Sequence, residues 1–478
     1  ATFVSRADVC DRHRTPIKST SVMLHMLFVL VLTEKISATI TSPIHNNRNN
    51  DNTVKLGEPE LVFVGGISVG SCDDFDLPDA PARAWRDDMG TVHLAASWAT
   101  SRFSHGPELG SVKHSCDVVF NSTMSGVNAL YADHEWILAP YLLEDNVTVM
   151  GVAHQEYHGF DHDNCSLCVP GHHTPGCVLP ADKVKQCWMV ALTSTISLDR
   201  GYTFKHTAQP PHHLVANAPY PYAPDHSEFG YGDPSGIFKH RTDGFYYMSA
   251  TSRTTHNALR QGTVLMRTAN LRDWKSWRCW NGSDFNVSFV DPYAIPAPNP
   301  NTLNQHVCKP ISDLNFVVLS IKWSTYFHAY IATGEGIYTF ENGSNTFAFF
   351  YKSALDDTLR NWSSAKLIRL RENNTTSISE NYPSLLDDSA TSRNFEEIGE
   401  NAWLYYTRQT RHTSGSVCTR GPWCRDLYRQ RISFNTNARV DTGVVGSVPH
   451  LPPSKSASSS SSSSSVSSSS SSLSSSLS

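Results

Sequence analysis

Acidic residues that stand beside strand-like segments could supply proton-transfer chemistry. Asp79, Glu135, Asp233 and Glu380 each lie close to the start of such a segment. Two carboxyl groups that face one substrate can divide the work, because the protonated one donates a proton while the ionised one attacks or activates water. Asp233 is the first candidate, since Pro234 fixes the backbone beside it. The alternative for each acid is a structural role in capping a strand, a loop or a turn.

A histidine-rich segment, 152–159, could add to this chemistry. On a β-strand the side chains of His154, Glu156 and His158 point to one face, because side chains alternate with period two. Together with Tyr157 such a face can bind a polar substrate such as a sugar, and Glu156 is a fifth candidate acid. The spacing differs from the helical His-Glu-x-x-His pattern of zinc enzymes, so we expect no metal here. An exposed strand end is the alternative.

Arg83, Trp85 and Tyr231 are further candidates for substrate binding. Arg83 and Trp85 follow Asp79 closely, and Tyr231 with Gly232 precedes Asp233, where a small residue would let a substrate approach. A tryptophan in the core and an arginine at the rim of a site are the alternatives for the first two residues.

Five segments rich in β-branched and aromatic residues repeat along the chain and predict strands. Two of them follow turns at Asp88 and Asp243, as in a β-hairpin. Their spacing of roughly sixty to a hundred residues is enough for four-stranded units with insertions. Long helical periodicity is not evident, so the chain is predicted to be all-β. The segments are 90–97, 147–154, 244–251, 328–333 and 402–407.

A second repeated element follows three of these strands. Each copy reads as a strand, a polar turn and a further strand that opens with an aromatic residue. The third and fourth strands of a propeller blade are joined in this way. The copies are 188–204, 264–277 and 348–362.

One of these turns, Ser197-Leu-Asp-Arg-Gly-Tyr-Thr-Phe204, resembles the Asp box of sialidases and other propellers. In this pattern Asp199 caps backbone amides of the turn, Gly201 takes the left-handed conformation and Phe204 packs between sheets. The pattern therefore predicts a hairpin and not a catalytic residue.

A longer stretch is similar to the arabinanase, β-xylosidase and invertase superfamily of glycoside hydrolases. The matching runs are Asp233-Pro-Ser-Gly-Ile-Phe, Asp243-Gly-Phe-Tyr-Tyr-Met248 and Arg267-Thr-Ala-Asn-Leu-Arg-Asp-Trp274. The resemblance implies a five-bladed β-propeller of four-stranded antiparallel blades over residues 56–435, with acids that meet in an axial funnel. Superfamily members usually carry an Asp in the first blade, an Asp in the second and a Glu in the third. Here the Asp-Pro pair falls in the third blade, so the usual order is not reproduced.

The two ends of the chain differ in composition from this body. A basic flank precedes the apolar run 22–32, which predicts a signal peptide over 1–38, with a buried core element as the alternative. The run is short for a bilayer span, so we expect no stable membrane insertion. Residues 39–55 are polar and predict a flexible linker, and 436–478 predict a disordered serine-rich tail.

Cysteines and glycosylation triplets agree with export from the cell. Cys10 precedes the expected cleavage point, which leaves ten of the eleven cysteines, an even number that five disulfides can use. A cluster of cysteines and histidines is predicted to form disulfides in preference to a zinc knuckle: Cys165, Cys168, His172, His173, Cys177 and Cys187. Cys418 and Cys424 bracket a short loop and can pair. The triplets begin at Asn121, Asn146, Asn164, Asn281, Asn286, Asn342, Asn361, Asn373 and Asn374.

These observations predict a secreted glycoside hydrolase that acts on an oligo- or polysaccharide. A net charge of −5 without a basic stripe argues against a nucleic-acid partner. The alternatives are a lectin-like propeller that binds glycans without catalysis, and an extracellular scaffold. We expect a monomer without an organic cofactor, and leave open whether a calcium ion occupies the axis.

Overall fold

The computed structural model describes residues 54–65, 72–73, 75–168, 186–253, 261–340, 342–371, 377–410 and 425–435. These residues form 24 β-strands and five short 3-10 helices, so the all-β prediction is confirmed. In this part of the chain no helix is long and apolar enough to cross a membrane. The predicted leader, most of the predicted linker and the serine-rich tail lie outside the described residues.

Antiparallel strands that follow one another along the chain build most of each sheet. The first sheet contains β2 (Arg83–Arg86), β3 (Val92–Ala95), β4 (Thr100–Gly106) and β5 (Lys113–Asn121). The next run of consecutive strands, counted as the second, contains β6 (His134–Leu142), β7 (Val149–His158) and β8 (Trp188–Ser197). The short strands β9 (Lys205–His206) and β10 (Leu214–Ala216) are both paired to β8. The third contains β11 (Phe229–Gly232), β13 (Tyr246–Arg253), β14 (Gly262–Thr268), β15 (Arg278–Trp280) and β16 (Phe285–Val287), with β12 (Phe238–Lys239) beside β13.

Two connections differ from this antiparallel pattern. The short parallel pairing of β11 with β8 joins the second and third runs into one 11-stranded sheet. The next sheet contains β17 (Val317–Ser324), β18 (Ala329–Thr339), β19 (Asn345–Ser353) and β20 (Lys366–Leu370), with β22 (Glu397–Ile398) parallel to β17. The 3-10 helices are η1 (Leu109–Ser111), η2 (Asn128–Leu130), η3 (Gly159–His162), η4 (Trp274–Ser276) and η5 (Pro300–His306).

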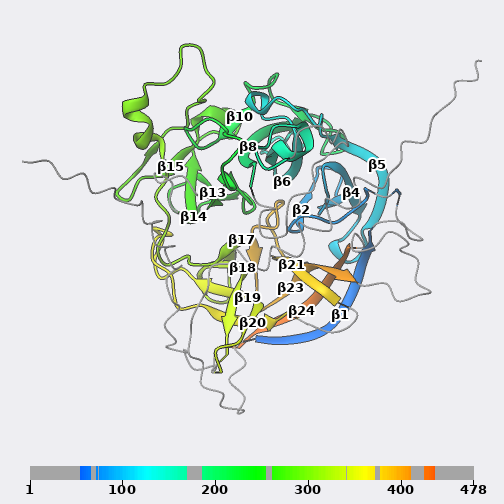
Figure 1. Cartoon of the computed structure of the whole chain (residues 1–478). Coiled ribbons are helices and arrows are strands. Elements are labelled where there is room, and N and C mark those ends of the chain that lie inside the picture. Colours follow the sequence, from blue (N-terminus) through cyan, green and yellow to red (C-terminus); the bar gives the residue numbers. More distant parts are fainter. Residues whose placement is uncertain are drawn as a thin grey trace, which may run out of the picture. The chain divides into compact units, whose positions relative to one another are not determined.

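The last sheet joins the two ends of the described chain. It contains β21 (Ser377–Leu386), β23 (Asn401–Thr410), β24 (Arg425–Phe434) and, at its edge, β1 (Val54–Val64). Figure 1 shows β1 in blue beside β24 in orange, and their antiparallel register places Val54 opposite Phe434. β1 begins two residues before the expected domain start at 56. This closure fixes the first strand through backbone hydrogen bonds to the last one.

The repeated segments found in the sequence are strands in the structure. The five segments coincide with β3, β7, β13, β18 and β23, and the strands that open the second repeated element are β8, β14 and β19. Each member of the second set pairs antiparallel with the strand before it. The content of β-branched and aromatic residues therefore located these hairpins correctly.

The turn Ser197–Phe204 is held by side-chain caps. Asp199 accepts a hydrogen bond from the Thr203 backbone N–H at 2.9 Å, and the Ser197 hydroxyl accepts one from Gly201 N–H at 2.8 Å. Gly201 has φ 107°, and a Cβ there would lie 2.3 Å from the ring of Trp85. The turn therefore needs glycine for both its conformation and its close contact with the neighbouring sheet.

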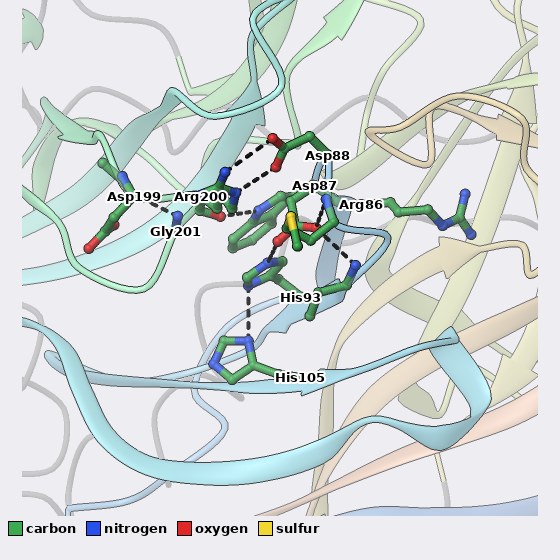
Figure 2. A network of polar contacts seen from close by, with 12 residues as sticks. Arg86, Asp87, Asp88, His93, His105, Asp199, Arg200 and Gly201 are labelled. Atoms are coloured by element: carbon green, nitrogen blue, oxygen red, sulfur yellow. Dashed lines mark hydrogen bonds and ion pairs between the residues drawn. The ribbon is translucent and has the colours of Figure 1, made fainter.

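An ion pair between Arg200 and Asp88 joins this turn to the first sheet, as Figure 2 shows. Arg200 pairs with Asp88 through its Nε at 2.5 Å, and its carbonyl accepts a hydrogen bond from Trp85 Nε1 at 2.8 Å. Nearby, the His93 ring lies between Asp87 at 3.0 Å and His105 at 2.9 Å. Side chains of two consecutive runs of strands are thereby fixed to each other.

Three disulfides lie within the described residues: Cys72–Cys116, Cys165–Cys187 and Cys279–Cys308. Cys168 is also disulfide-bonded. For Cys165, Cys168 and Cys187 the disulfide prediction is therefore confirmed and the zinc knuckle is excluded. The remaining predicted participants, His172, His173, Cys177, Cys418 and Cys424, lie outside the described residues.

A buried arginine on the first sheet binds backbone carbonyls from three other segments. Arg83 donates from Nε to Leu138 O at 3.1 Å, and from Nη2 to Leu319 O at 2.5 Å and to Pro234 O at 3.4 Å. A fourth bond runs from Nη1 to Ala82 O at 3.1 Å. The side chain is only 4% exposed, and burial lowers the pKa of Arg83 to about 9.

β-Bulges free two of these carbonyls. The register of β6 shifts at Leu138 and that of β17 shifts at Leu319. A bulged residue is left unpaired in the ladder, so its carbonyl can accept a hydrogen bond from elsewhere. Arg83 thus satisfies acceptors that the sheets themselves leave unsatisfied.

We predict that Arg83→Met destabilises the protein by about 3 kcal/mol or more, because it leaves several buried carbonyls without a donor. Urea unfolding followed by circular dichroism measures the change. Arg86→Met, on the same strand, is the matched control: its guanidinium stacks 5.0 Å from the centroid of Phe395 and its loss should cost at most about 1 kcal/mol. Equal unfolding midpoints for the two variants would contradict the role assigned to Arg83.

Candidate functional site

A short hydrogen-bonded chain joins the end of β11 to β7. The backbone N–H of Asp233 donates to His154 Nδ1 at 3.0 Å, and His154 Nε2 lies 2.8 Å from Glu156 Oε1. Because Nδ1 accepts, it carries no proton, so His154 is the neutral tautomer whose Nε2–H donates to Glu156. A Cβ at residue 232 would lie 2.6 Å from His154 Cε1, so Gly232 is what allows this close approach.

The other oxygen of Glu156 binds a second histidine. His158 Nε2 lies 2.9 Å from Glu156 Oε2, and its Nδ1 lies 3.3 Å from Asp161 Oδ2. Burial opposes the charge on His158, but the two carboxylates outweigh it and raise its pKa to about 10. Burial likewise opposes ionisation of Glu156, yet His154 and His158 hold its pKa well below the usual range. Glu156 is therefore an ionised carboxylate beside a cationic imidazole.

Asp233 is held ionised by an arginine of the next strand. Arg253, on β13, forms ion pairs with both Asp233 and Glu228. Burial opposes the charge of Asp233, but the positive charge of Arg253 and its hydrogen bond outweigh burial and lower the pKa of Asp233. Asp233 also has φ 45°, a conformation that is uncommon outside glycine and that occurs disproportionately at functional sites.

Glu335 on β18 has the opposite behaviour. Burial raises its pKa from the ordinary 4.5 to about 7, and the negative charge of Asp233 adds to this shift, while Arg371, the Tyr382 backbone N–H and Arg253 act against it. Tyr382 donates that N–H to Glu335 Oε2 at 3.2 Å. Glu335 is thus an acid whose pKa is raised toward neutrality, which is the property of a general acid.

A bulge in β21 gives Tyr382 this position. The register of β21 against β23 shifts between Asn381 and Ser384, and Tyr382 has φ 61°. The bulge turns its N–H away from the ladder and toward Glu335. Asp79 lies nearby, because it pairs with Arg425, whose guanidinium carbon lies 5.6 Å from the centroid of the Tyr382 ring.

The predicted acids therefore separate into two groups. Asp79, Glu156 and Asp233 belong to one connected cluster, and Glu135 and Glu380 have other environments. Glu380 is 1% exposed and is bound by Arg369 at 3.1 Å and by Arg408 at 2.8 Å. These two guanidiniums occupy its carboxylate, so we leave it out of the proposed site.

Glu135 lies on the other face of the same sheet. In the register of β6 and β7, Glu135 is paired with Gln155. His154 and Glu156 are the sequence neighbours of Gln155, so their side chains point to the opposite face of the sheet. The Glu135 carboxylate accepts a hydrogen bond from the Thr193 hydroxyl at 2.7 Å and lies 2.8 Å from His206 Nε2. It does not join the cluster around Asp233.

Of the predicted substrate-binding residues, His154 and His158 belong to the cluster and four others are buried. Trp85, Tyr157 and Tyr231 are fully buried at 0% exposure, and Arg83 is 4% exposed. The Tyr231 hydroxyl accepts a hydrogen bond from Cys308 N–H at 2.9 Å, and the Tyr157 hydroxyl accepts one from Asn164 at 2.9 Å. We assign these four side chains to packing.

Glu335, Arg253 and Tyr382 were not among the predicted site residues. The signal for Glu335 is a single charged residue between two glycines, Gly334 and Gly336, in an otherwise uncharged strand. A Cβ on Gly334 would lie 1.8 Å from Val317 O, so the glycine permits close strand approach. Arg253 and Tyr382 carry no local signal, because their contacts depend on strand register.

No protein-family model matches the sequence, and no curated protein matches it. Solved structures that are similar include an α-L-arabinofuranosidase from Lactobacillus brevis, with 10% identity, 80% of this chain and 98% of that chain covered, and a TM-score of 0.40. A protein of unknown function from Dyadobacter fermentans has 10% identity, 80% and 100% coverage and a TM-score of 0.42. An α-L-arabinanase from Cellvibrio cellulosa, complexed with arabinohexaose, has 9% identity, 74% and 90% coverage and a TM-score of 0.38. At these values the likenesses assign no residue and no activity to this chain.

We predict that Glu335 makes stability fall as pH rises from about 4.5 to 7. The folded protein keeps a proton on Glu335 up to about pH 7, whereas the unfolded chain releases it near 4.5. Within this window the unfolded chain gains free energy by ionising this carboxyl and the folded protein does not, so Glu335→Gln should remove a loss on the order of 3 kcal/mol. Urea midpoints at a series of pH values measure it.

The exposed Glu400 provides the matched control for this experiment. Glu400→Gln should keep the pH dependence of the wild-type protein. If Glu335→Gln also keeps it, the carboxyl of Glu335 has an ordinary pKa and the general-acid assignment is lost.

Proposed function

We propose that the protein is a five-bladed β-propeller that hydrolyses glycosidic bonds. The proposed blades are the five runs that begin at β2, β6, β11, β17 and β21, with β1 completing the last one. Contacts of Arg83 with segments of three other runs support an arrangement in which the first strands converge. The body of the propeller is proposed to span 56–435, as the sequence predicts.

The observation that carries the hydrolase proposal is a pair of acids with opposite pKa shifts. Glu335 has a pKa of about 7 and can donate a proton near neutral pH. Asp233 has a lowered pKa and is ionised under the same conditions. Glycoside hydrolysis needs this division, with one carboxylic acid protonating the leaving oxygen and one carboxylate acting as nucleophile or base.

The surrounding residues orient these two acids. Arg253 keeps Asp233 ionised, and the neutral His154 ring fixes its backbone N–H. The cationic His158 and ionised Glu156 provide polar groups that can bind sugar hydroxyls. Asp79 with Arg425 adds a second ion pair beside Tyr382. The proposed substrate is an oligo- or polysaccharide, bound among these charged side chains.

A glycan-binding propeller without catalysis is the second candidate. It is favoured by one feature of the site: the carboxylates of Asp79 and Asp233 are engaged in ion pairs with arginines. A binder would hold sugar hydroxyls with these paired groups and would transfer no proton. Turnover and binding measured on the same glycan separate the two candidates.

We further propose that the protein is secreted. Three disulfides fit an oxidising compartment outside the cytoplasm. The basic and apolar start of the chain and its glycosylation triplets support the same proposal.

We predict that Asp233→Asn and Glu335→Gln each lower kcat on a responsive glycan by about 100-fold or more, because each removes a group needed for proton transfer or attack. A panel of aryl glycosides and plant or algal polysaccharides identifies the glycan. Glu400→Gln is the control and should keep wild-type turnover. Unchanged turnover in Asp233→Asn would remove Asp233 from the mechanism, and wild-type binding without turnover would favour the lectin.

The pH–rate profile gives a separate test of Glu335. A general acid must be protonated, so kcat/KM should fall about tenfold per pH unit above its pKa of about 7. A profile that stays flat well above this value would show that another group donates the proton.

A further inference from the structure

We propose that Glu135, His206 and His213 form a binding site for a divalent transition-metal ion of the zinc class. This site is independent of the proposed hydrolase activity, because it lies on the face of β7 opposite to Glu156. Its three ligand atoms lie within 4.8 Å of one another.

The sheet and one loop bring the three residues together. Glu135 lies on β6, and its side chain reaches across β7 to Thr193 on β8. His206 on β9 is paired with Thr195 of β8, and the backbone carbonyl of His213, just before β10, accepts a hydrogen bond from Ser194 N–H at 2.8 Å. The loop between the two histidines thus leaves β8 and returns to it, and places both rings over the carboxylate.

The distances suit a common ligand. Glu135 Oε2 lies 2.8 Å from His206 Nε2, and Glu135 Oε1 lies 3.5 Å from His213 Nε2. The two rings have centroids 4.3 Å apart. Ligand atoms about 2.0–2.2 Å from a tetrahedral zinc ion are separated by about 3.3 Å, so small side-chain movements convert this arrangement into a coordination shell.

Buried polar atoms without partners point to a ligand at this place. His213 and Glu135 are both 0% exposed. Neither ring nitrogen of His213 has a hydrogen-bond partner among the described residues, and the same holds for both amide atoms of Gln155, which is paired with Glu135 across β6 and β7. A buried polar atom without a partner destabilises the fold, and coordination of a metal by His213 Nε2 would remove part of this cost.

The donor set selects the class of metal. Two imidazoles and one carboxylate are the ligands of many zinc sites, with a water molecule as the fourth ligand. Calcium and magnesium prefer oxygen donors and do not suit two histidines. The ring of His206 is 15% exposed, which gives a path from the surface.

The other groups with suitable spacing are less suited to a metal. Cys72, beside Asp76 and His114, is consumed by its disulfide with Cys116. His158, beside His134 and Asp161, already binds a carboxylate with each ring nitrogen. His213 differs from these because its nitrogens have no hydrogen-bond partner within the part of the chain that the structure describes.

Zinc retention by the full chain tests the proposal. The purified protein is stripped with chelator, loaded with zinc chloride, dialysed and analysed for metal by mass spectrometry. We expect the wild-type protein to retain one zinc ion per chain and His213→Ala to lose it. His212→Ala is the matched control, because His212 is the adjacent exposed histidine, and it should retain zinc like the wild type. A wild-type protein without retained zinc, or a His213→Ala variant that retains it, overturns the site.

Two further measurements cover the case in which His213→Ala fails to fold. His206→Ala alters a partly exposed residue; its circular dichroism should match the wild type, and zinc should raise the melting temperature of the wild type but not of this variant. X-ray absorption of the zinc-loaded wild-type protein should show two imidazoles and oxygen ligands. A sulfur shell, or zinc stabilisation that persists in His206→Ala, contradicts the proposal, whereas inactivity toward glycans leaves it unaffected.

Discussion

The buried guanidinium of Arg83 is the interaction on which the arrangement of the candidate site depends. A cation with 4% exposure and a pKa lowered to about 9 is costly to bury, and here backbone carbonyls compensate for it. Three of its four carbonyl partners belong to segments that carry or adjoin a site residue. Pro234 follows Asp233, Leu138 lies on the partner strand of β7, and Leu319 lies on the partner strand of β18. One side chain thus sets the mutual positions of the segments that carry Asp233, Glu156 and Glu335.

The charges around these acids explain why their pKa values differ. Asp233 and Glu156 each contact a cation or a histidine that donates to the carboxylate, so the ionised form is favoured despite burial. Glu335 receives a backbone N–H from Tyr382, but burial and the charge of Asp233 dominate. Environments that push the pKa values of neighbouring acids apart are how a site obtains an acid and a base at one pH. The same ion pairs that keep Asp233 charged also hold it in place.

The sequence predicted strands better than it predicted the site. β-Branched and aromatic content and turn residues located the hairpins, because these signals are local and each hairpin pairs adjacent segments. The sequence also placed His154, Glu156 and His158 correctly on one face. It missed Glu335, for which the flanking glycines were the available signal, and it could not find Arg253 or Tyr382, because their contacts arise from bulges and from pairing between distant segments. Aromatic residues such as Trp85 and Tyr231 were assigned to substrate, whereas both are packed in the core.

The alternation of β7 also explains how one strand can serve two different sites. Even-numbered residues His154 and Glu156 face Asp233, and odd-numbered Gln155 faces the side of Glu135. The two polar sets are separated by the thickness of the sheet, and each uses its own histidines. Charge or metal binding on one face therefore need not disturb the hydrogen bonds of the other. A shift of the β6–β7 register by one residue would exchange the faces and dismantle both sets together, so the bulge at Leu138 that Arg83 binds matters to both.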